Sequence, residues 1–320
     1  STGAVTTLAG SPGSDGSSDG AGGLARFNGP RDVAVDGSGN LYITDVANFT
    51  VRKIALSGIV STLAGSPGMI GSALGTGASA RFNLIETISV DGAGSVYVAE
   101  VHDGLRKISP AGVVTLFLNR RLSARVTTVD SVGNVYVGGA ALGKYLPDGT
   151  MVGLAGDGQY GSADGTGTAA RFREPGDLAA DAIGNIYVAD TGNHTIRKVT
   201  PAGVVSTLAG AAGVAGALDG LALRARFNGP KGIAVDPEGN LFVADTGNNL
   251  IRKITPAGLV TTMGGLSGVI DSRDGTGSLA RFNAPSGIAV DRNGAVYVAD
   301  TGNNTIRKGV VAAAPPSIIC

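Results

Sequence analysis

The sequence predicts an all-β fold, a six-bladed β-propeller whose blades are four-stranded antiparallel sheets. Three observations support this prediction: one unit recurs six times in 320 residues, each copy carries short apolar runs, and the first residues complete the last copy. Repeated units of this size bury their apolar faces against one another, either in an open solenoid or in a closed ring. The third observation favours the ring.

The unit at residues 225–264 is the cleanest copy and shows the expected strands. Its four apolar runs cover residues 231–235, 240–244, 250–254 and 259–263. Runs of about five residues rich in β-branched side chains suit strands and are too short for helices. The connections, such as the one that begins at Asp236, contain the Pro, Gly and Asn residues that turns require. We therefore expect each unit to be an antiparallel meander.

A recurrent Arg-Phe pair, here called the anchor, sets the spacing of the units. It begins at Arg26, Arg81, Arg171, Arg226 and Arg281, so that most copies lie 55 residues apart. The 90 residues between Arg81 and Arg171 are expected to hold two shorter units, and Arg125-Val126 is placed in the anchor position of the degenerate third unit. The second and third strands also recur six times, which gives six units.

The two ends of the chain predict how the ring closes. The sixth unit has no proper fourth strand after Lys308, whereas residues 1–9 match the fourth strand at residues 201–209. The N-terminal strand is therefore expected to supply the outer strand of the last blade, which removes the exposed edges of an open array. We expect one propeller domain over residues 1–309 and a Pro-containing linker or tail over residues 310–320.

These repeats resemble the NHL-repeat family of β-propellers. The resemblance rests on the motifs A-R-F-x-x-P-x-G-I-A-V-D, x-G-N-L-Y-V-A-D-T-G-N-N-x-I-R-K and V-x-T-L-A-G, and it extends from Ser1 to Lys308. It implies the propeller fold. The family includes sensors, adhesion and protein-binding modules, some RNA binders and a lyase, so function has to be argued from particular sites.

Composition excludes several kinds of partner and site. The 25 basic and 25 acidic residues cancel without any run of like charge, so neither nucleic acid nor an anionic membrane surface is indicated. No apolar stretch approaches the roughly 20 residues that span a bilayer. The single cysteine, Cys320, excludes intramolecular disulfides and a Cys-based zinc site. The Gly-rich composition without Trp is typical of secreted bacterial proteins, and we expect an extracellular or cell-surface protein whose export signal has been removed.

Charged residues recur at the end of the second strand and within the third strand. An acid and an arginine at these positions are diagonal neighbours on one face of the hairpin, and the third unit lacks both, with Gly139 and Gly143 instead. We interpret the pairs as a structural clasp; the alternative is a ring of acids that binds cations or a substrate. Anchor arginines could join as third members, and Arg125 would then lack its acid. The predicted pairs are Asp45 and Arg52, Glu100 and Arg106, Asp190 and Arg197, Asp245 and Arg252, and Asp300 and Arg307.

No catalytic residue, metal site or cofactor is predicted. Loops with acids and glycines, at Asp164, at Asp274 and from Asp15 to Asp19, leave Ca²⁺ open as an alternative, but they lack the spacing of a calcium loop. The amidating lyases that share this propeller use several histidines around zinc, and this chain has only His102 and His194.

The third unit is where the symmetry of the ring is broken. It lacks the long insertion that precedes the first strand of other units, and it gathers Arg120, Arg121, Arg125 and Lys144. A missing loop would leave a basic notch on the face that carries the loops, suited to an acidic partner; the alternative is simple degeneration of one repeat.

We therefore expect a non-enzymatic binding or scaffold module that contacts a protein, a ligand or a neighbouring domain near this unit. The alternatives are a Ca²⁺-dependent lactonase or lyase at the channel mouth, and a subunit of an extracellular assembly or homo-oligomer.

Overall fold

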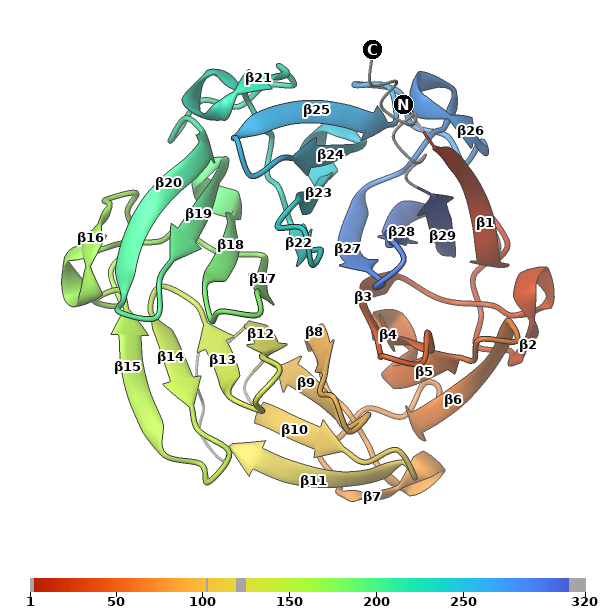
Figure 1. The fold of residues 1–320 in the computed structure, drawn as a ribbon. Coiled ribbons are helices and arrows are strands. Elements are labelled where there is room, and N and C mark those ends of the chain that lie inside the picture. The colour runs from red at the N-terminus through yellow and green to blue at the C-terminus, as the bar shows by residue number, and fades with distance from the viewer. Residues whose placement is uncertain (1–2, 102, 119–124, 311–320) are drawn as a thin grey trace, which may run out of the picture.

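The computed structural model describes residues 3–101, 103–118 and 125–310, which form six antiparallel sheets around a central channel (Figure 1). The predicted six-bladed β-propeller is confirmed. Blades are numbered along the chain, and the first strand of each blade lines the channel. None of the helices in these ranges has the length and apolar character that a membrane crossing requires.

Each of the first three blades is a meander that runs outward from the channel. Blade 1 contains β3 (Pro30–Val35), β4 (Leu41–Asp45), β5 (Thr50–Ile54) and β6 (Ile59–Gly65). Blade 2 contains β8 (Ile85–Val90), β9 (Val96–Glu100), β10 (Gly104–Ile108) and β11 (Val113–Leu118). Blade 3 contains β12 (Val126–Val129), β13 (Val135–Gly138), β14 (Leu142–Tyr145) and β15 (Met151–Ala155).

The other three blades follow the same plan, and the last one is completed by the N-terminal strand. Blade 4 contains β17 (Asp177–Ala180), β18 (Ile186–Asp190), β19 (Thr195–Val199) and β20 (Val204–Gly210). Blade 5 contains β22 (Gly232–Val235), β23 (Leu241–Asp245), β24 (Leu250–Ile254) and β25 (Leu259–Gly264). Blade 6 contains β27 (Pro285–Val290), β28 (Ala295–Asp300), β29 (Thr305–Val310) and β1 (Ala4–Gly10).

The ring closes through β1, as the sequence predicts. This strand pairs antiparallel with β29, with Val5 opposite Gly309 and Thr7 opposite Arg307. Figure 1 shows the N-terminal strand in red beside the blue strands of the last blade. The pairing satisfies an edge that would otherwise be exposed.

Five of the six blades carry a short fifth strand that the sequence analysis did not predict. Each is a two-residue strand inside the insertion that precedes a blade, and it pairs with the outer strand of that blade; the described residues of blade 3 contain none. Periodicity cannot reveal a strand of two residues. These strands are β2 (Gly20–Ala21), β7 (Gly75–Thr76), β16 (Gly165–Thr166), β21 (Gly220–Leu221) and β26 (Gly275–Thr276).

Single-turn 3₁₀ helices complete the irregular segments. Five of them follow the short fifth strands: η1 (Gly22–Leu24), η3 (Gly77–Ser79), η4 (Gly167–Ala169), η6 (Ala222–Arg224) and η8 (Gly277–Leu279). In the part of the chain that the structure describes, four more lie in turns between second and third strands: η2 (Val46–Asn48), η5 (Thr191–Asn193), η7 (Thr246–Asn248) and η9 (Thr301–Asn303).

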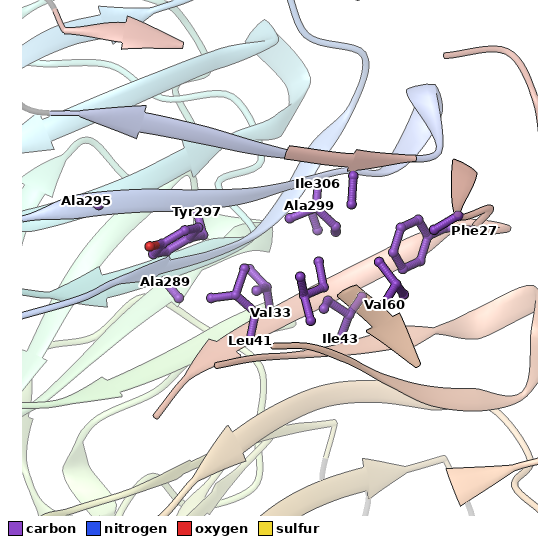
Figure 2. Packing of buried hydrophobic residues seen from close by; sticks show 13 residues of the cluster. Phe27, Val33, Leu41, Ile43, Val60, Ala289, Ala295, Tyr297, Ala299 and Ile306 are labelled. Carbon is purple, nitrogen blue, oxygen red and sulfur yellow. The ribbon is translucent and has the colours of Figure 1, made fainter. Parts of the chain in front are cut away.

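Apolar packing between neighbouring blades forms the core. Between blades 6 and 1, Val33 and Ile43 pack with Tyr297, Ile306 and the anchor residue Phe27, and each is at most 5% exposed (Figure 2). Equivalent clusters fill the other interfaces. Burial of this apolar surface is the main term that stabilises the ring.

The insertions and the turns between second and third strands lie at the same end of the ring, here called the loop face. Asn48, in one such turn, donates a hydrogen bond of 2.7 Å from its amide to the carbonyl of Gly16, in the insertion. Because neighbouring strands are antiparallel, every first strand also begins at this end. One mouth of the channel therefore opens on the loop face.

Candidate functional site

Five blades bring the predicted acid and arginine together inside the sheet. In blade 4 the Arg197 guanidinium lies 2.8 Å from the Asp190 carboxylate, and both side chains are fully buried. The acid also accepts hydrogen bonds from the Asn193 amide and from the backbone N–H of Arg173. The same ion pair joins Asp45 to Arg52, Glu100 to Arg106, Asp245 to Arg252, and Asp300 to Arg307.

The third charged member of this clasp is an aspartate from the insertion and not the anchor arginine. Arg197 donates to Asp164 at 2.7 Å and to two backbone carbonyls, while its guanidinium lies 5.3 Å from the Phe172 ring centroid. The anchor side chain points elsewhere: Arg226 donates to the carbonyls of Leu223 and Ala225. Only the backbone carbonyl of the anchor arginine joins the clasp. The anchor residue therefore does lie beside the acid and the arginine, but the prediction that its side chain is a third charged member was wrong.

The same aspartates occupy the loops in which Ca²⁺ was considered. Asp164 accepts from Arg197 and from both the N–H and the hydroxyl of Thr207, at 2.7 to 3.0 Å. Asp19 and Asp274 make the equivalent bonds in blades 1 and 6. The insertions are therefore tied to their blades by carboxylates. Across the described ranges, no three acidic, histidine or cysteine side chains are grouped so that they could hold a metal ion.

Burial dominates the protonation equilibria of the clasp. It raises the pKa of Asp190, against the lowering effects of Asn193, the Arg173 N–H and Arg197, and it raises the pKa of Asp245 to about 6. All five acids are 0% exposed. A ligand on the surface cannot reach them, which favours the structural role over a ring of substrate-binding acids.

Blade 2 uses a variant of the clasp. Leu74 stands seven residues before Arg81, where blade 1 has Asp19 before Arg26, and the second acid is Asp103 from the turn, 3.9 Å from Arg106. Burial raises the pKa of Glu100 to about 7, and the adjacent Arg106 opposes this.

Blade 3 lacks the clasp and has a cavity in its place. About 430 Å³ of space on the loop face is lined by Gly139, Gly143, Tyr145, Met151 and Gly153, among other uncharged residues. The notch expected from the missing insertion is therefore present, but its described lining is not basic. Lys144 lies 5.7 Å from the ring centroid of Tyr136, as the matching lysines do in other blades. Arg120 and Arg121 lie outside the described residues.

The prediction that Arg125 occupies the anchor position of the third unit was wrong. The N–H of Arg125 donates to the carbonyl of Gly138, as the N–H of Lys231 does to Ala244 and that of Gly176 does to Ala189. These shared bonds place Arg125 at the start of the first strand, five residues after the anchor position. The alignment puts Arg120-Arg121 in the place of Arg-Phe, so the error came from matching residue type without strand register.

The correct register reveals a ring of residues at the mouth of the channel. Each blade contributes one residue at the start of its first strand, and blades 1, 3 and 5 contribute cations. A cavity of about 180 Å³ lies among these residues. The six are Arg31, Glu86, Arg125, Gly176, Lys231 and Ser286.

The charges at this mouth interact strongly. Arg31 forms an ion pair with Glu86, which is buried on the neighbouring blade. Burial raises the pKa of Glu86, whereas Arg31, Arg125 and Lys231 lower it. Burial, together with repulsion by Arg31, lowers the pKa of Lys231. This set could not be predicted from the sequence, because the residue at this position varies between units instead of repeating.

Two buried aspartates lie one residue further along the first strands of blades 1 and 4. Asp32 accepts from the N–H of Ile88 in blade 2 at 2.8 Å, and Asp177 accepts from the N–H of Ile233 in blade 5 at 3.0 Å. Each also accepts from the N–H of the residue that follows it. Burial raises the pKa of Asp32 to about 7, and burial together with the charge of Asp32 raises that of Asp177 well above its usual value.

His194 links blades and does not belong to a histidine cluster. Its backbone is left-handed, with φ of 59°, and its Nδ1 accepts from the N–H of Gly229 at 2.9 Å. The amide oxygens of Asn249 and Asn304 make the same link in other blades, each at 2.8 Å. His102 lies outside the described residues.

Comparison with known proteins agrees with this architecture. The NHL repeat model matches residues 27–54, 172–199, 227–254 and 282–308, which belong to blades 1, 4, 5 and 6. The chain is 29% identical to the chloroplastic protein SUPPRESSOR OF QUENCHING 1 of Arabidopsis thaliana over 77% of its length, and 28% identical to human NHL repeat-containing protein 2 over 88%. It spans 26% and 39% of the lengths of these two proteins.

Solved structures show the same fold at lower identity. A Bacteroides thetaiotaomicron protein of unknown function gives a TM-score of 0.78 at 24% identity, covering 96% of this chain and 75% of that one. An auxiliary nutrient binding protein from the same organism gives 0.76 at 19%, covering 96% and 76%. A gluconolactonase from Xanthomonas campestris gives 0.61 at 14%, covering 96% and 89%. These structures share the fold, and the four repeat matches together with the NHL repeat-containing relative identify the chain as an NHL-repeat β-propeller.

Proposed function

We propose that this propeller is a non-enzymatic binding module whose ligand or protein partner contacts the loop face beside blade 3. The observation that carries the proposal is the cavity of about 430 Å³ in that blade. It lies where the other blades bury an acid and an arginine, and its described lining is uncharged. Concave apolar sites of this size are typical of ligand pockets, so we expect a neutral, apolar group to bind there.

Exposed apolar side chains on the insertions support a role in binding. Ile70, Tyr160 and Ile270 occupy equivalent positions, and the backbone of each forms an isolated β-bridge with the anchor phenylalanine of its unit. Their side chains are 61%, 64% and 64% exposed. Tyr160 also borders a further cavity of about 370 Å³ near blade 4. Each of these side chains would add one apolar contact for a partner that covers the loop face.

The proposal includes an extracellular or cell-surface location and, as an extension, membership of a surface assembly. The Gly-rich composition with a single cysteine is compatible with secretion. The fold is also that of the auxiliary nutrient binding protein described above. A neighbouring domain or a second copy of the chain would be a suitable partner for the exposed loops.

The proposed role of the notch in binding is tested by a substitution that fills the cavity with a larger side chain. Gly153 lines the cavity, its φ is not left-handed, and a Cβ there would meet no atom within 4 Å, so Gly153→Leu should fold and occupy the space. Gly92, at the opposite end of the ring, is equally open, which makes Gly92→Leu the matched control. Ligand-observed NMR with neutral aromatic fragments such as indole should show binding to the native protein and to Gly92→Leu only. Equal binding to Gly153→Leu would refute the proposal.

The alternative function is a Ca²⁺-dependent lactonase or lyase at the channel mouth. The two buried acids Asp32 and Asp177, and the fold shared with a gluconolactonase, favour this alternative. Against it, every carboxylate oxygen of this pair already accepts a backbone N–H. Metal analysis of the purified protein separates the two functions. One tightly bound Ca²⁺ per chain, lost in Asp32→Asn, would support the enzyme and count against the non-enzymatic binding module.

A further inference from the structure

We propose that the loop face carries a second binding site, specific for a sugar acid such as a hexuronate, in a groove between the insertions of blades 4 and 5. In this site Tyr160 stacks on the sugar ring and Arg173 binds the carboxylate. The groove is the cavity of about 370 Å³ that Tyr160 borders. It shares no lining residue with the notch in blade 3, so either site can be occupied without the other.

Tyr160 differs from every other aromatic residue of the chain. There are eight phenylalanines and seven tyrosines, all within the described ranges, and Tyr160 is the only one that is exposed. Its side chain is 64% exposed, whereas the other six tyrosines are at most 8% exposed. The equivalent positions of blades 5 and 6 hold Ala215 and Ile270, so the fold does not require an aromatic ring there. The ring of Tyr160 is therefore free to contact a ligand.

Arg173 also breaks the pattern of its position. It stands two residues after the anchor arginine, where the other four Arg-Phe anchors are followed by Asn28, Asn83, Asn228 and Asn283. In blade 5 the Asn228 amide donates to the carbonyl of Gly247 at 3.2 Å. In blade 4 the stem of Arg173 packs on the equivalent glycine, Gly192, where an added Cβ would lie 2.7 Å from Arg173 Cγ. The longer arginine extends beyond the place of the asparagine and lines the groove.

The charge of the groove is positive, because Arg173 is the only charged residue among its described lining residues. Arg173 forms no ion pair with a carboxylate of the described residues. The next residue, Glu174, lines the cavity at the channel mouth and not the groove. The acids of the insertion and the clasp already have partners: Asp157 pairs with Arg171, and Asp164 and Asp190 pair with Arg197. One positive charge therefore remains for a ligand, which matches a single carboxylate.

Hydrogen bonds fix both walls of the groove. The Asn193 amide donates to the carbonyl of Gly161 in the insertion of blade 4 at 2.7 Å. The N–H of Gly213, in the insertion of blade 5, donates to the carbonyl of Asn193 at 3.2 Å. The two insertions are thus tied to one turn, and the groove is largely preformed. Cavities of roughly 300–1,000 Å³ hold small-molecule ligands, so this one suits a mono- or disaccharide.

The combination of side chains selects the class of ligand. A pyranose ring presents C–H groups on its face and hydroxyls at its edge, which complements the apolar face and polar tip of a tyrosine. A guanidinium binds a carboxylate through two parallel N–H···O bonds, and the exposed hydroxyl of Ser162 in the lining can bond to a sugar hydroxyl. A purely apolar ligand would leave Arg173 unpaired, and a simple carboxylic acid would leave Tyr160 without a contact. A hexuronate satisfies all three side chains.

Ligand-observed NMR titration of the whole chain tests the site with galacturonate, galactose and acetate as probes. The two sugars differ only in carrying a carboxylate or a hydroxymethyl group. The native protein should bind galacturonate about tenfold more tightly than galactose, and acetate more weakly than either sugar. Arg173→Asn introduces the residue of the other blades and should abolish the preference for galacturonate. Tyr160→Ala introduces the residue found at Ala215 and should weaken binding of both sugars about tenfold.

Two control variants locate the bound sugar. Arg273→Asn removes an arginine that is 63% exposed in the insertion of blade 6, and Gly153→Leu fills the notch in blade 3. Both should bind galacturonate as the native protein does, and loss of binding in Gly153→Leu would overturn the proposal by placing the sugar in the notch. The proposal is also overturned if neither sugar binds, if galactose or acetate binds as tightly as galacturonate, or if Arg173→Asn and Arg273→Asn behave alike. Thermal unfolding verifies that each variant is folded.

Discussion

The clasp makes a quantitative prediction for Arg197→Ala in blade 4. This change removes four hydrogen bonds, two to the carboxylates of Asp190 and Asp164 and two to backbone carbonyls. It leaves the carboxylate of Asp190 fully buried without its counter-ion. Removing one partner of a buried ion pair costs about 3–5 kcal/mol, mainly because the remaining charge stays desolvated. We expect the free energy of unfolding, measured in urea at pH 7, to fall by about that amount.

Arg171→Ala in the same blade is the matched control. The Arg171 side chain is 47% exposed and pairs with Asp157 at the surface, 2.9 Å away. Exposed pairs of this kind contribute little to stability because water and salt screen them. The control should therefore unfold at nearly the native urea concentration, although it also removes one arginine and one ion pair.

The pH dependence of Arg197→Ala gives an independent test of the mechanism. Burial already raises the pKa of Asp190, and Arg197 opposes that shift, so loss of the arginine should raise the pKa further. An acid whose pKa is higher in the folded state stabilises the fold in its protonated form, and this contribution is lost as pH rises. The deficit of the variant should be smaller at pH 5 than at pH 8. If Arg197→Ala and Arg171→Ala lower stability equally at both values, the clasp is not a stabilising element.

Three further perturbations have defined outcomes. Burial raises the pKa of Asp32 to about 7 from 3.8, so native stability should fall as pH rises from about 4 through 7, and Asp32→Asn should flatten this slope in urea titrations at each pH. Deletion of residues 1–10 removes β1 and exposes β29, and size-exclusion chromatography should show association or aggregation; an unchanged monomer with the native melting temperature would disprove closure by this strand. His194→Asn should retain the hydrogen bond from Gly229 and be neutral, whereas His194→Ala should cost about 1 kcal/mol in thermal unfolding, and equal effects would show that the acceptor is unimportant.

The repeated features of the fold were predictable because each is local and occurs several times. Alternating apolar runs with turn residues between them determine the four-stranded meander, and the match of residues 1–9 to a fourth strand indicates closure. The pairing of Asp190 with Arg197 was also predictable, since a hairpin register makes them diagonal neighbours and blade 3 lacks both members. A two-residue fifth strand leaves no periodic signal and was missed.

The candidate sites could be predicted only in part. The absence of an insertion indicated the notch in blade 3, but Lys144 proved to lie beside Tyr136 and not in the notch. Arg125 was placed in the wrong register because blade 3 is degenerate, and a shift of five residues moved it from the anchor to the channel mouth. Its true neighbours, Arg31 and Lys231, lie about a hundred residues away on either side in the sequence.

The sequence by itself determined the number of blades, their strands, the closing strand and the acid-arginine pairs, because these depend on short-range periodicity repeated in each unit. Tertiary structure alone decided which aspartate completes each clasp, from the insertion or, in blade 2, from the turn, and which six residues meet at the channel mouth. The physical reason is the geometry of closure: a ring brings one non-repeating residue from every blade to a common axis. The spacing of residues within a single unit does not show which residues of different blades lie close together at that axis.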